Sequence, residues 1–191
     1  MNATFERFLQ YLRHERNLSW RTVDTYQRDL LQWEAYMTAG NHPFDPLSVT
    51  PGDIRSWVIE RAAQGDCPAT LRRRVQALRA FYRYLLRKNL LSSNPAAQVE
   101  LAKMPRPLPK LVREKTVDAL LDAHVDTDDF TQVRDRLVVM LFYETGIRLS
   151  ELIGLQDTAV DTFKRELKVH GKRDKDRLVP FGTELAQWID R

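Results

Sequence analysis

Two short segments in the second half of the chain carry side chains suited to phosphate chemistry. The first is ETGIRLSEL, which places Arg148 at a turn between two expected helices, just before the second one starts. A helix N-terminus favours an anion, because its backbone N–H groups point outward and the helix dipole is positive there. An arginine adds a fork of donors that matches two phosphate oxygens. On residue type alone, Arg148 fits a phosphate contact and a structural ion pair with a carboxylate equally well.

The second segment is VHGKRDKDRLVP, which has Lys172 at the tip of an expected hairpin. A hairpin tip can bring a lysine over a substrate. The lysine can hold or donate a proton there once nearby cations or burial lower its pKa. The alternative is a solvated turn lysine with no chemical role, which is the commoner case for a single lysine.

A third candidate is a helix with one apolar face, expected over about residues 69–88. Its other faces carry seven cations: Arg72, Arg73, Arg74, Arg79, Arg83, Arg87 and Lys88. Such a helix can neutralise DNA phosphates and release their counterions, with Tyr82 and Tyr84 as further contacts. The alternative is a solvated helix surface. The triplet Arg72-Arg73-Arg74 favours a bound anion, because its like charges repel each other and have few acidic neighbours to pair with.

Apolar spacing predicts the helices that position these side chains. In the first part of the chain it predicts four, over about residues 4–16, 20–39, 51–64 and 69–88. Ser19 is the expected N-cap of the second helix. The run Thr50-Pro51-Gly52-Asp53 has the residue order of a helix start for the third.

The second part of the chain has a different pattern. It predicts helices near residues 114–124 and 130–145, the latter ended by Gly146, and a short helix over ELIGL capped by Ser150. Residues 165–170 and 176–181 are then expected as two strands, and a last helix starts near Thr183.

A proline-rich segment separates the two parts. Residues 104–110 read MPRPLPK, and alternate prolines favour an extended, stiff connector. The charge changes at the same place: residues 1–110 carry 17 Lys and Arg against 10 Asp and Glu, whereas residues 111–191 carry 13 against 16. This asymmetry predicts a basic domain over 1–103 with an anionic partner, and a second domain over 111–191.

Composition excludes several classes of protein. The longest fully apolar run, residues 137–143, is far shorter than the roughly 20 residues of a membrane span, and the first residues lack the pattern of a secretory signal. The single cysteine, Cys67, can form no internal disulfide, and the four histidines lack zinc-ligand spacing. We therefore expect a cytoplasmic protein with no metal site and no membrane partner.

Taken together, these segments resemble the tyrosine recombinase (phage integrase) family. TGIRLSELIGL, followed about two dozen residues later by KVHGKRDKDRLVP, is similar to the catalytic domain of that family, above all in its Xer subgroup of bacterial chromosome-dimer resolving recombinases. TLRRRVQALRAFYRYLLRKNLLSSNPA is similar to the last helix of the N-terminal core-binding domain. RPLPKLVREKTVDALLDA resembles the linker and the first catalytic helix. The resemblance covers essentially the whole chain.

The resemblance implies a mainly α fold in three parts. A four-helix, SAM-like core-binding domain would span residues 1–103, and a linker would span 104–110. Residues 111–191 would form the first part of a mixed α/β catalytic domain with a small antiparallel β-hairpin.

It also implies a chemistry. In this family a tyrosine attacks the scissile DNA phosphate, forms a 3′-phosphotyrosyl bond and frees a 5′-hydroxyl, with no cofactor. Arg148 matches the arginine that clamps the non-bridging oxygens, and Lys172 matches the hairpin lysine that protonates the departing oxygen. Glu151 matches an acidic residue three places after the arginine, which would orient neighbouring active-site groups.

The implied partner is a double-stranded DNA recombination site, with a second protomer in a tetramer on the DNA and no small-molecule substrate. The expected DNA-binding residues are Arg72, Arg73, Arg74, Arg79, Arg83 and Arg173. Arg173 stands where the family usually has glycine after the hairpin lysine. An arginine there can change the turn, lower the pKa of Lys172 or contact DNA, and the sequence leaves these open.

No histidine or tyrosine follows Lys172 in this sequence, whereas the family uses a His-x-x-Arg pair, a further His or Trp, and its tyrosine beyond the hairpin. Tyr143, in the apolar helix before Arg148, is interpreted as a core residue. We assign no nucleophile, and we expect a chain truncated within its catalytic domain that binds DNA without cleaving it.

Three classes of function follow. The first is a site-specific recombinase, for chromosome-dimer resolution at cell division or for integration of a mobile element or integron. The second is a non-catalytic DNA-binding regulator, and the third is a helical interaction protein with no DNA partner. A steep salt dependence of DNA affinity separates the first two from the third.

Overall fold

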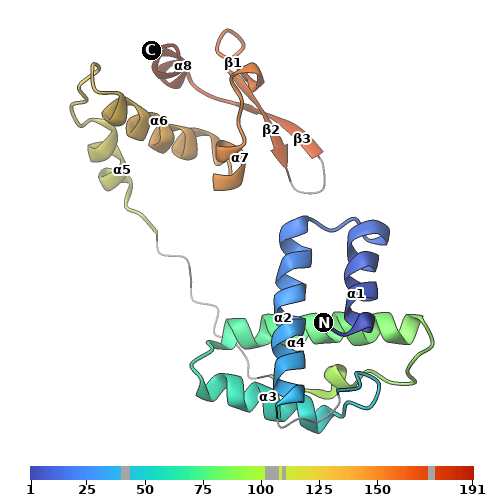
Figure 1. Cartoon of the computed structure of the whole chain (residues 1–191). Coiled ribbons are helices and arrows are strands. Elements are labelled where there is room, and N and C mark those ends of the chain that lie inside the picture. Colours follow the sequence, from blue (N-terminus) through green and yellow to red (C-terminus); the bar gives the residue numbers. More distant parts are fainter. Residues whose placement is uncertain (40–43, 102–107, 109–110, 172–174) are drawn as a thin grey trace. The chain divides into compact units, whose positions relative to one another are not determined.

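The computed structural model describes residues 1–39, 44–101, 108, 111–171 and 175–191. The chain divides into two compact units, unit 1 over Met1–Pro107 and unit 2 over Leu108–Arg191 (Figure 1). Each unit has a hydrophobic core of its own. Of the expected linker over 104–110, the described residues include Leu108 alone.

Unit 1 contains the four helices predicted from apolar spacing. They are α1 (Ala3–Gln10), α2 (Trp20–Thr38), α3 (Pro51–Ala63) and α4 (Pro68–Arg87), followed by a 3-10 turn over Pro95–Gln98. The first predicted helix differs in detail, because its last part, Tyr11–Glu15, is wound as a π-helix. Such wide turns are rare and are often found at functional sites.

Local capping explains where α3 begins. The Thr50 backbone N–H donates to Asp53 Oδ2 at 2.8 Å, and the Asp53 N–H donates to Thr50 Oγ1 at 3.3 Å, which confirms the predicted helix start. Ser19 does precede α2, but its side chain makes no capping bond. Its hydroxyl pairs instead with that of Thr22 at 3.0 Å.

The core of unit 1 is largely aromatic. Trp33 and Trp57 meet edge to face with ring centroids 5.1 Å apart, and Phe5 and Phe8 both pack edge-on against Phe81 of α4. Burial of each such side chain contributes about 1.5–3 kcal/mol. In Figure 1, α1 and α2 run side by side and α4 crosses α2. The apolar face of α4 is thereby covered, which decides which of its cations stay at the surface.

Unit 2 combines helices with a small sheet. The helices are α5 (Glu114–Leu121), α6 (Phe130–Thr145), α7 (Leu149–Ile153) and α8 (Thr183–Ile189), with a 3-10 turn over Asp157–Ala159. The strands are β1 (Val160–Asp161), β2 (Glu166–Gly171) and β3 (Lys175–Pro180), antiparallel in the order β1-β2-β3. The mainly α fold with a small antiparallel sheet is confirmed. The pattern missed β1, because two residues are too few to show an alternation.

The sheet anchors the hairpin that carries the candidate lysine. Leu167 and Val169 of β2 are buried with Met140 of α6 and Leu185 of α8. The last residue pair of the hairpin is Gly171 with Lys175. Lys172 and Arg173 lie between them, outside the described residues.

Two predictions about the segment before the hairpin need correction. Gly146 ends α6 with a φ of +59°, as predicted. The following helix starts at Leu149, so Arg148 and not Ser150 stands at its N-cap. Tyr143 was expected in the core but is 52% exposed, because α6 turns that side away from the buried residues of unit 2.

No helix in the part of the chain that the structure describes is both long enough and apolar enough to span a membrane.

Removal of the Thr50 cap tests the start of α3. Thr50→Ala removes an acceptor for the Asp53 N–H, so we expect the free energy of unfolding of the 191-residue chain to fall by about 1 kcal/mol. The measurement is urea denaturation followed by circular dichroism. Thr38→Ala is the matched control, because Thr38 is exposed at the end of α2 and its hydroxyl bonds back to carbonyl oxygens of its own helix, those of Glu34 and Ala35. Equal losses in both variants would contradict the assignment.

Candidate functional site

Three charged residues from two elements meet in unit 2. Arg148 and Glu151 come from the start of α7, and Arg177 comes from β3. The Glu151 side chain is 3% exposed, whereas those of Arg148 and Arg177 are 67% and 41% exposed. We call these residues the Glu151 cluster.

Four N–H donors converge on the Glu151 carboxylate. Arg177 donates from Nη1 to Oε1 at 2.7 Å and from Nη2 to Oε2 at 2.9 Å. Arg148 donates from Nη1 to Oε1 and from its backbone N–H to Oε2, both at 2.8 Å. A carboxylate has about four lone-pair positions, so these bonds fill it. They lower the pKa of Glu151 to about 2, with Arg177 as the largest cause.

The backbone explains why these side chains meet. Gly146 stops α6, and three residues separate the two helices, the last of which, Arg148, has an extended backbone directly before α7. Glu151 is the third residue of α7, and its carboxylate folds back to the Arg148 N–H. The anion expected at this helix start is therefore the chain's own Glu151. The Arg148 backbone N–H is thus used by Glu151, and the unbonded donors of the Arg148 guanidinium are the groups that an external anion could contact.

The stem of the hairpin touches the same cluster. A Cβ added at Gly171 would lie 3.0 Å from the Lys175 carbonyl oxygen and 3.4 Å from Arg177 Nη1. It would also lie 3.8 Å from Glu151 Oε1. The residue directly before Lys172 thus lies against the Arg177–Glu151 pair, and a side chain there would crowd the Lys175 carbonyl oxygen.

A second group of charged residues lies on the two strands of the hairpin, with Lys168 and His170 on β2 and Asp176 on β3. His170 Nδ1 is 2.8 Å from Asp176 Oδ1, and Lys168 Nζ is 3.0 Å from Asp176 Oδ2. These bonds lower the pKa of Asp176. Together with Ser150 and Glu151 these residues line a cavity of about 340 Å³ beside α7.

Sequence reasoning missed Arg177. Its segment, DRLVPF over 176–181, was predicted as a strand, and nothing in a strand pattern shows which distant carboxylate a side chain meets. Arg177 lies opposite Val169 in the ladder, and cross-strand partners share a face. A register prediction would have placed Arg177 on the face of the buried Val169, where an arginine needs a partner.

In unit 1 the structure sorts the arginines of α4 into two groups. Arg74 is buried, with its Nε 3.1 Å from Asp66 Oδ2, and Arg73 pairs with Asp29. Arg79 donates to the carbonyl oxygens of Ala96 and Val99, at 3.0 and 2.7 Å. These three side chains make contacts within the fold, and their expected role as DNA contacts stays a prediction.

Two members of the triplet have acidic partners, one distant in the sequence and one close to it. Asp29 is on α2, 44 residues before Arg73, and its burial raises its pKa while Arg73 opposes that rise. Asp66 precedes α4, and its hydrogen bond from Arg61 lowers its pKa. The expectation that the triplet has few acidic neighbours to pair with was therefore wrong for Arg73 and Arg74.

The two tyrosines of α4 are also inside. Tyr82 is fully buried, which raises its pKa, and Tyr84 is nearly so. Tyr82 presents no surface for DNA, in contrast to the expectation from the sequence, whereas Tyr84 lines a surface groove.

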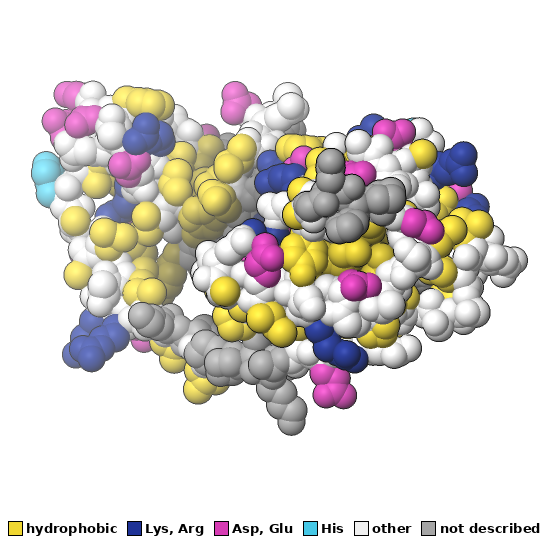
Figure 2. Space-filling view, turned by 60° about the horizontal axis from the view of Figure 1, so that its bottom comes forward, with side chains coloured by type: hydrophobic (Ala, Val, Ile, Leu, Met, Phe, Trp, Pro, Cys, Tyr) yellow, Lys and Arg dark blue, Asp and Glu magenta, His cyan; other side chains and the backbone are white. Residues whose placement is uncertain are grey.

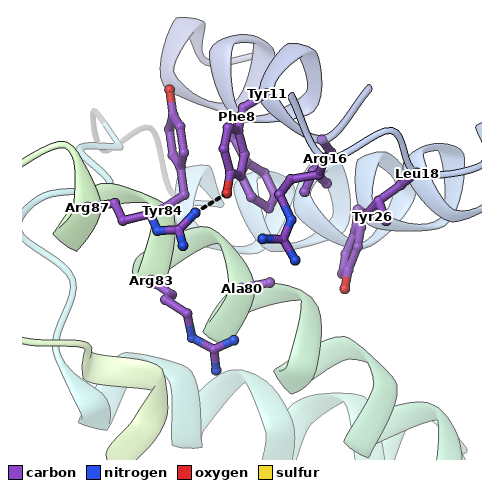
Figure 3. A pocket seen from close by; sticks show the side chains of 10 residues that line it. Phe8, Tyr11, Arg16, Leu18, Tyr26, Ala80, Arg83, Tyr84 and Arg87 are labelled. Carbon is purple, nitrogen blue, oxygen red and sulfur yellow. Dashed lines mark hydrogen bonds between the residues drawn. The ribbon is translucent and has the colours of Figure 1, made fainter. Parts of the chain in front are cut away.

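A groove of about 250 Å³ collects cations that do stay at the surface. It is lined by Arg16, after the π-helix, and by Arg83 and Arg87 of α4, over Phe8, Tyr11 and Tyr84 (Figure 3). The Arg87 guanidinium donates to the Tyr11 hydroxyl. The described residues that line this groove include three arginines and no carboxylate. This composition favours an anion with an aromatic floor beneath it.

The lysine and arginine side chains are not gathered into one continuous patch on the face shown in Figure 2. Figure 2 shows one face on which lysine and arginine side chains lie in separate patches with carboxylates among them. The argument for an anion therefore rests on the local composition of the groove and not on the overall charge.

Comparison with known proteins gives the family. The model of the phage integrase N-terminal SAM-like domain matches residues 5–89, and that of the phage integrase family matches residues 110–191. The chain belongs to the phage integrase family. Its two matched segments correspond to the two units, and together they leave few residues uncovered.

Relatives within the phage integrase family are Xer recombinases. The chain is 36% identical to the tyrosine recombinase XerD of Yersinia pestis, over 99% of this chain and 62% of that protein. It is 38% identical to the tyrosine recombinase XerC of Mycobacterium sp. (strain JLS), over 98% of this chain and 63% of that protein. The chain therefore spans somewhat less than two thirds of the length of these relatives and is of the Xer type.

Solved structures of phage integrases share the fold. The Tn1549 transposon integrase, in complex with circular intermediate DNA, is 18% identical with a TM-score of 0.68, over 98% of this chain and 63% of that one. A lambda integrase tetramer bound to a Holliday junction is 16% identical with a TM-score of 0.71, over 98% and 52%. At these identities the likeness concerns the fold alone.

The lowered pKa of Glu151 predicts how stability depends on pH. The pKa is near 4.5 when unfolded and about 2 when folded, so the carboxylate contributes stability above pH 4.5 that is lost as the pH falls through 2. We expect wild type to exceed Glu151→Gln in free energy of unfolding above pH 4.5, and this difference to shrink between pH 4.5 and 2. Denaturation of both chains across this range measures it. A difference independent of pH would contradict the assignment.

Proposed function

We propose that the whole protein is a site-specific recombinase that breaks and rejoins DNA through a 3′-phosphotyrosyl intermediate. The observation that carries the proposal is the Glu151 cluster. It holds Arg148 by one guanidinium bond and packs against the stem of the hairpin that carries Lys172. An arginine has five N–H donors, so most of the Arg148 fork is available for a phosphate.

The proposed roles follow from charge and geometry. Arg148 would donate to the non-bridging oxygens of the scissile phosphate, where negative charge builds in the transition state. As the tyrosine oxygen bonds to phosphorus, the bond to the 5′-oxygen breaks, and Lys172 would pass its proton to that oxygen. Glu151 would keep Arg148 in place. We assign the nucleophile to none of the six tyrosines in this chain.

We propose that unit 1 binds the DNA backbone. A phosphate fits the groove of Arg16, Arg83 and Arg87, since three cations there have no described carboxylate among them. Arg72 and Arg173 remain proposed DNA contacts. Arg73, Arg74 and Arg79 would support this surface from below through their bonds within the fold.

The biological setting is proposed from the relatives. Identity of 36–38% to XerC and XerD favours chromosome-dimer resolution, in the cytoplasm, over integration of a mobile element. The likeness to the lambda integrase tetramer on a Holliday junction supports a tetramer of protomers on DNA. The Tn1549 integrase shares only 18% of residues with this chain.

DNA binding by unit 1 gives the first test of the proposal. We expect the 191-residue chain to bind duplex DNA with an affinity that falls steeply with salt, and Arg83→Ala to weaken binding and reduce the salt slope by about 1. Fluorescence anisotropy at 50–200 mM salt measures both, a range chosen because counterion release dominates there.

Arg55→Ala is the matched control for this experiment. Arg55 is an exposed arginine of α3 that does not line the groove, so its loss should leave the salt slope unchanged. If the chain shows no salt-dependent DNA binding, the reading of a helical interaction protein without a DNA partner replaces the proposal.

Covalent chemistry gives the second test. On a nicked duplex the whole protein should accumulate a covalent protein–DNA product, and Lys172→Ala should slow it by about 10²–10⁴-fold. The 191-residue chain should form none. Binding without a covalent product from the whole protein would favour a DNA-binding regulator.

A further inference from the structure

Two arginines share one buried carboxylate in the Glu151 cluster, and they share it unequally. Arg177 takes both oxygens side-on, at 2.7 and 2.9 Å. The Arg148 guanidinium takes one oxygen through one nitrogen, at 2.8 Å. The Arg148 backbone N–H takes the other oxygen.

This division leaves no lone pair of Glu151 for a second bond from Arg148. The carboxylate accepts about four hydrogen bonds, and the four bonds described above fill it. Apart from Nη1, the nitrogens of the Arg148 guanidinium therefore make no bond to Glu151. Its side chain is 67% exposed, compared with 41% for Arg177.

Loss of Arg177 would open two acceptor positions next to Arg148. Arginine and carboxylate groups prefer a bidentate pair with two parallel bonds, and Arg148 is already attached to Oε1. A second bond from Arg148 would complete such a pair. The cluster would also change from two cations and one anion to one of each, with less attraction for a phosphate.

We propose that Arg177 is a positioning residue: by occupying both oxygens of Glu151, it leaves Arg148 with a single guanidinium bond to the protein and its other donors available for a DNA phosphate. The inference rests on the proposed function for its use in catalysis. The competition for Glu151 is a property of this chain that can be measured without DNA.

A purely structural role for Arg177 makes a different prediction. If Arg177 only tied β3 to α7, removing Glu151 as well would relieve an unpaired buried charge, but the hydrogen bonding of the Arg148 guanidinium would be the same in wild type and Arg177→Ala. In our proposal the harm comes from the collapse of Arg148 onto Glu151. Because glutamine carries no charge and has a single acceptor oxygen, Glu151→Gln should relieve part of the defect caused by Arg177→Ala.

The first experiment measures the competition directly in the 191-residue chain. Side-chain ¹⁵N NMR follows the two Nη groups of Arg148. In wild type we expect one to be protected from exchange with water and the other to exchange freely; in Arg177→Ala both should be protected. Arg134→Ala is the control, since Arg134 is exposed on α6 and pairs with its neighbour Asp135. The same pattern in wild type and Arg177→Ala would overturn the proposal.

The second experiment measures the consequence for catalysis in the whole protein. Single-turnover formation of the covalent product should slow by up to about a hundredfold in Arg177→Ala, less in Arg177→Lys, and not at all in Arg134→Ala. The double variant Arg177→Ala/Glu151→Gln should be faster than Arg177→Ala. A double variant as slow as Arg177→Ala, or slower, would overturn the proposal.

Two checks keep the outcomes distinct. Circular dichroism and DNA affinity establish that each variant is folded, and Arg177→Lys supplies the test if Arg177→Ala does not fold. If the wild-type whole protein forms no covalent product, the proposed function fails. The NMR comparison still decides whether Arg177 frees Arg148.

Discussion

A single carboxylate, that of Glu151, joins the parts of unit 2 that carry the candidate chemistry. It receives Arg148 from the segment between α6 and α7 and Arg177 from β3, and it lies beside Gly171 at the end of β2. A buried charge is tolerated only when it is paired and hydrogen-bonded. The need to satisfy Glu151 therefore fixes the position of helix start, strand and hairpin stem at once.

The same requirement organises unit 1. Asp29 is buried among the helices, and Asp66 is largely so, and each draws an arginine of α4 to it. Those arginines are committed to the fold, while Arg83 and Arg87 stay at the surface with Arg16. In both units, buried carboxylates thus divide a set of similar arginines into those that hold the protein together and those that can meet a phosphate.

The fold itself tolerates wide variation in sequence. The likeness to integrases at 16–18% identity shows that the backbone arrangement tolerates extensive substitution. In the proposed function, a phosphate would meet a few side chains whose neighbours are restrained by carboxylates. Arg177 is one of the residues that would act indirectly, since it would affect the scissile phosphate only through Glu151 and Arg148.

The sequence by itself determined the helices, the start of α3 at Thr50, the stop of α6 at Gly146 and the hairpin, because each follows from periodicity or capping within a few residues. It also placed Arg148, Glu151 and Lys172 in a recognisable order. Only the tertiary structure decided which arginines are paired, that Tyr82 is buried and Tyr143 exposed, and that Arg177 meets Glu151. These depend on contacts between residues distant in the chain, such as Asp29 with Arg73, which no local pattern encodes.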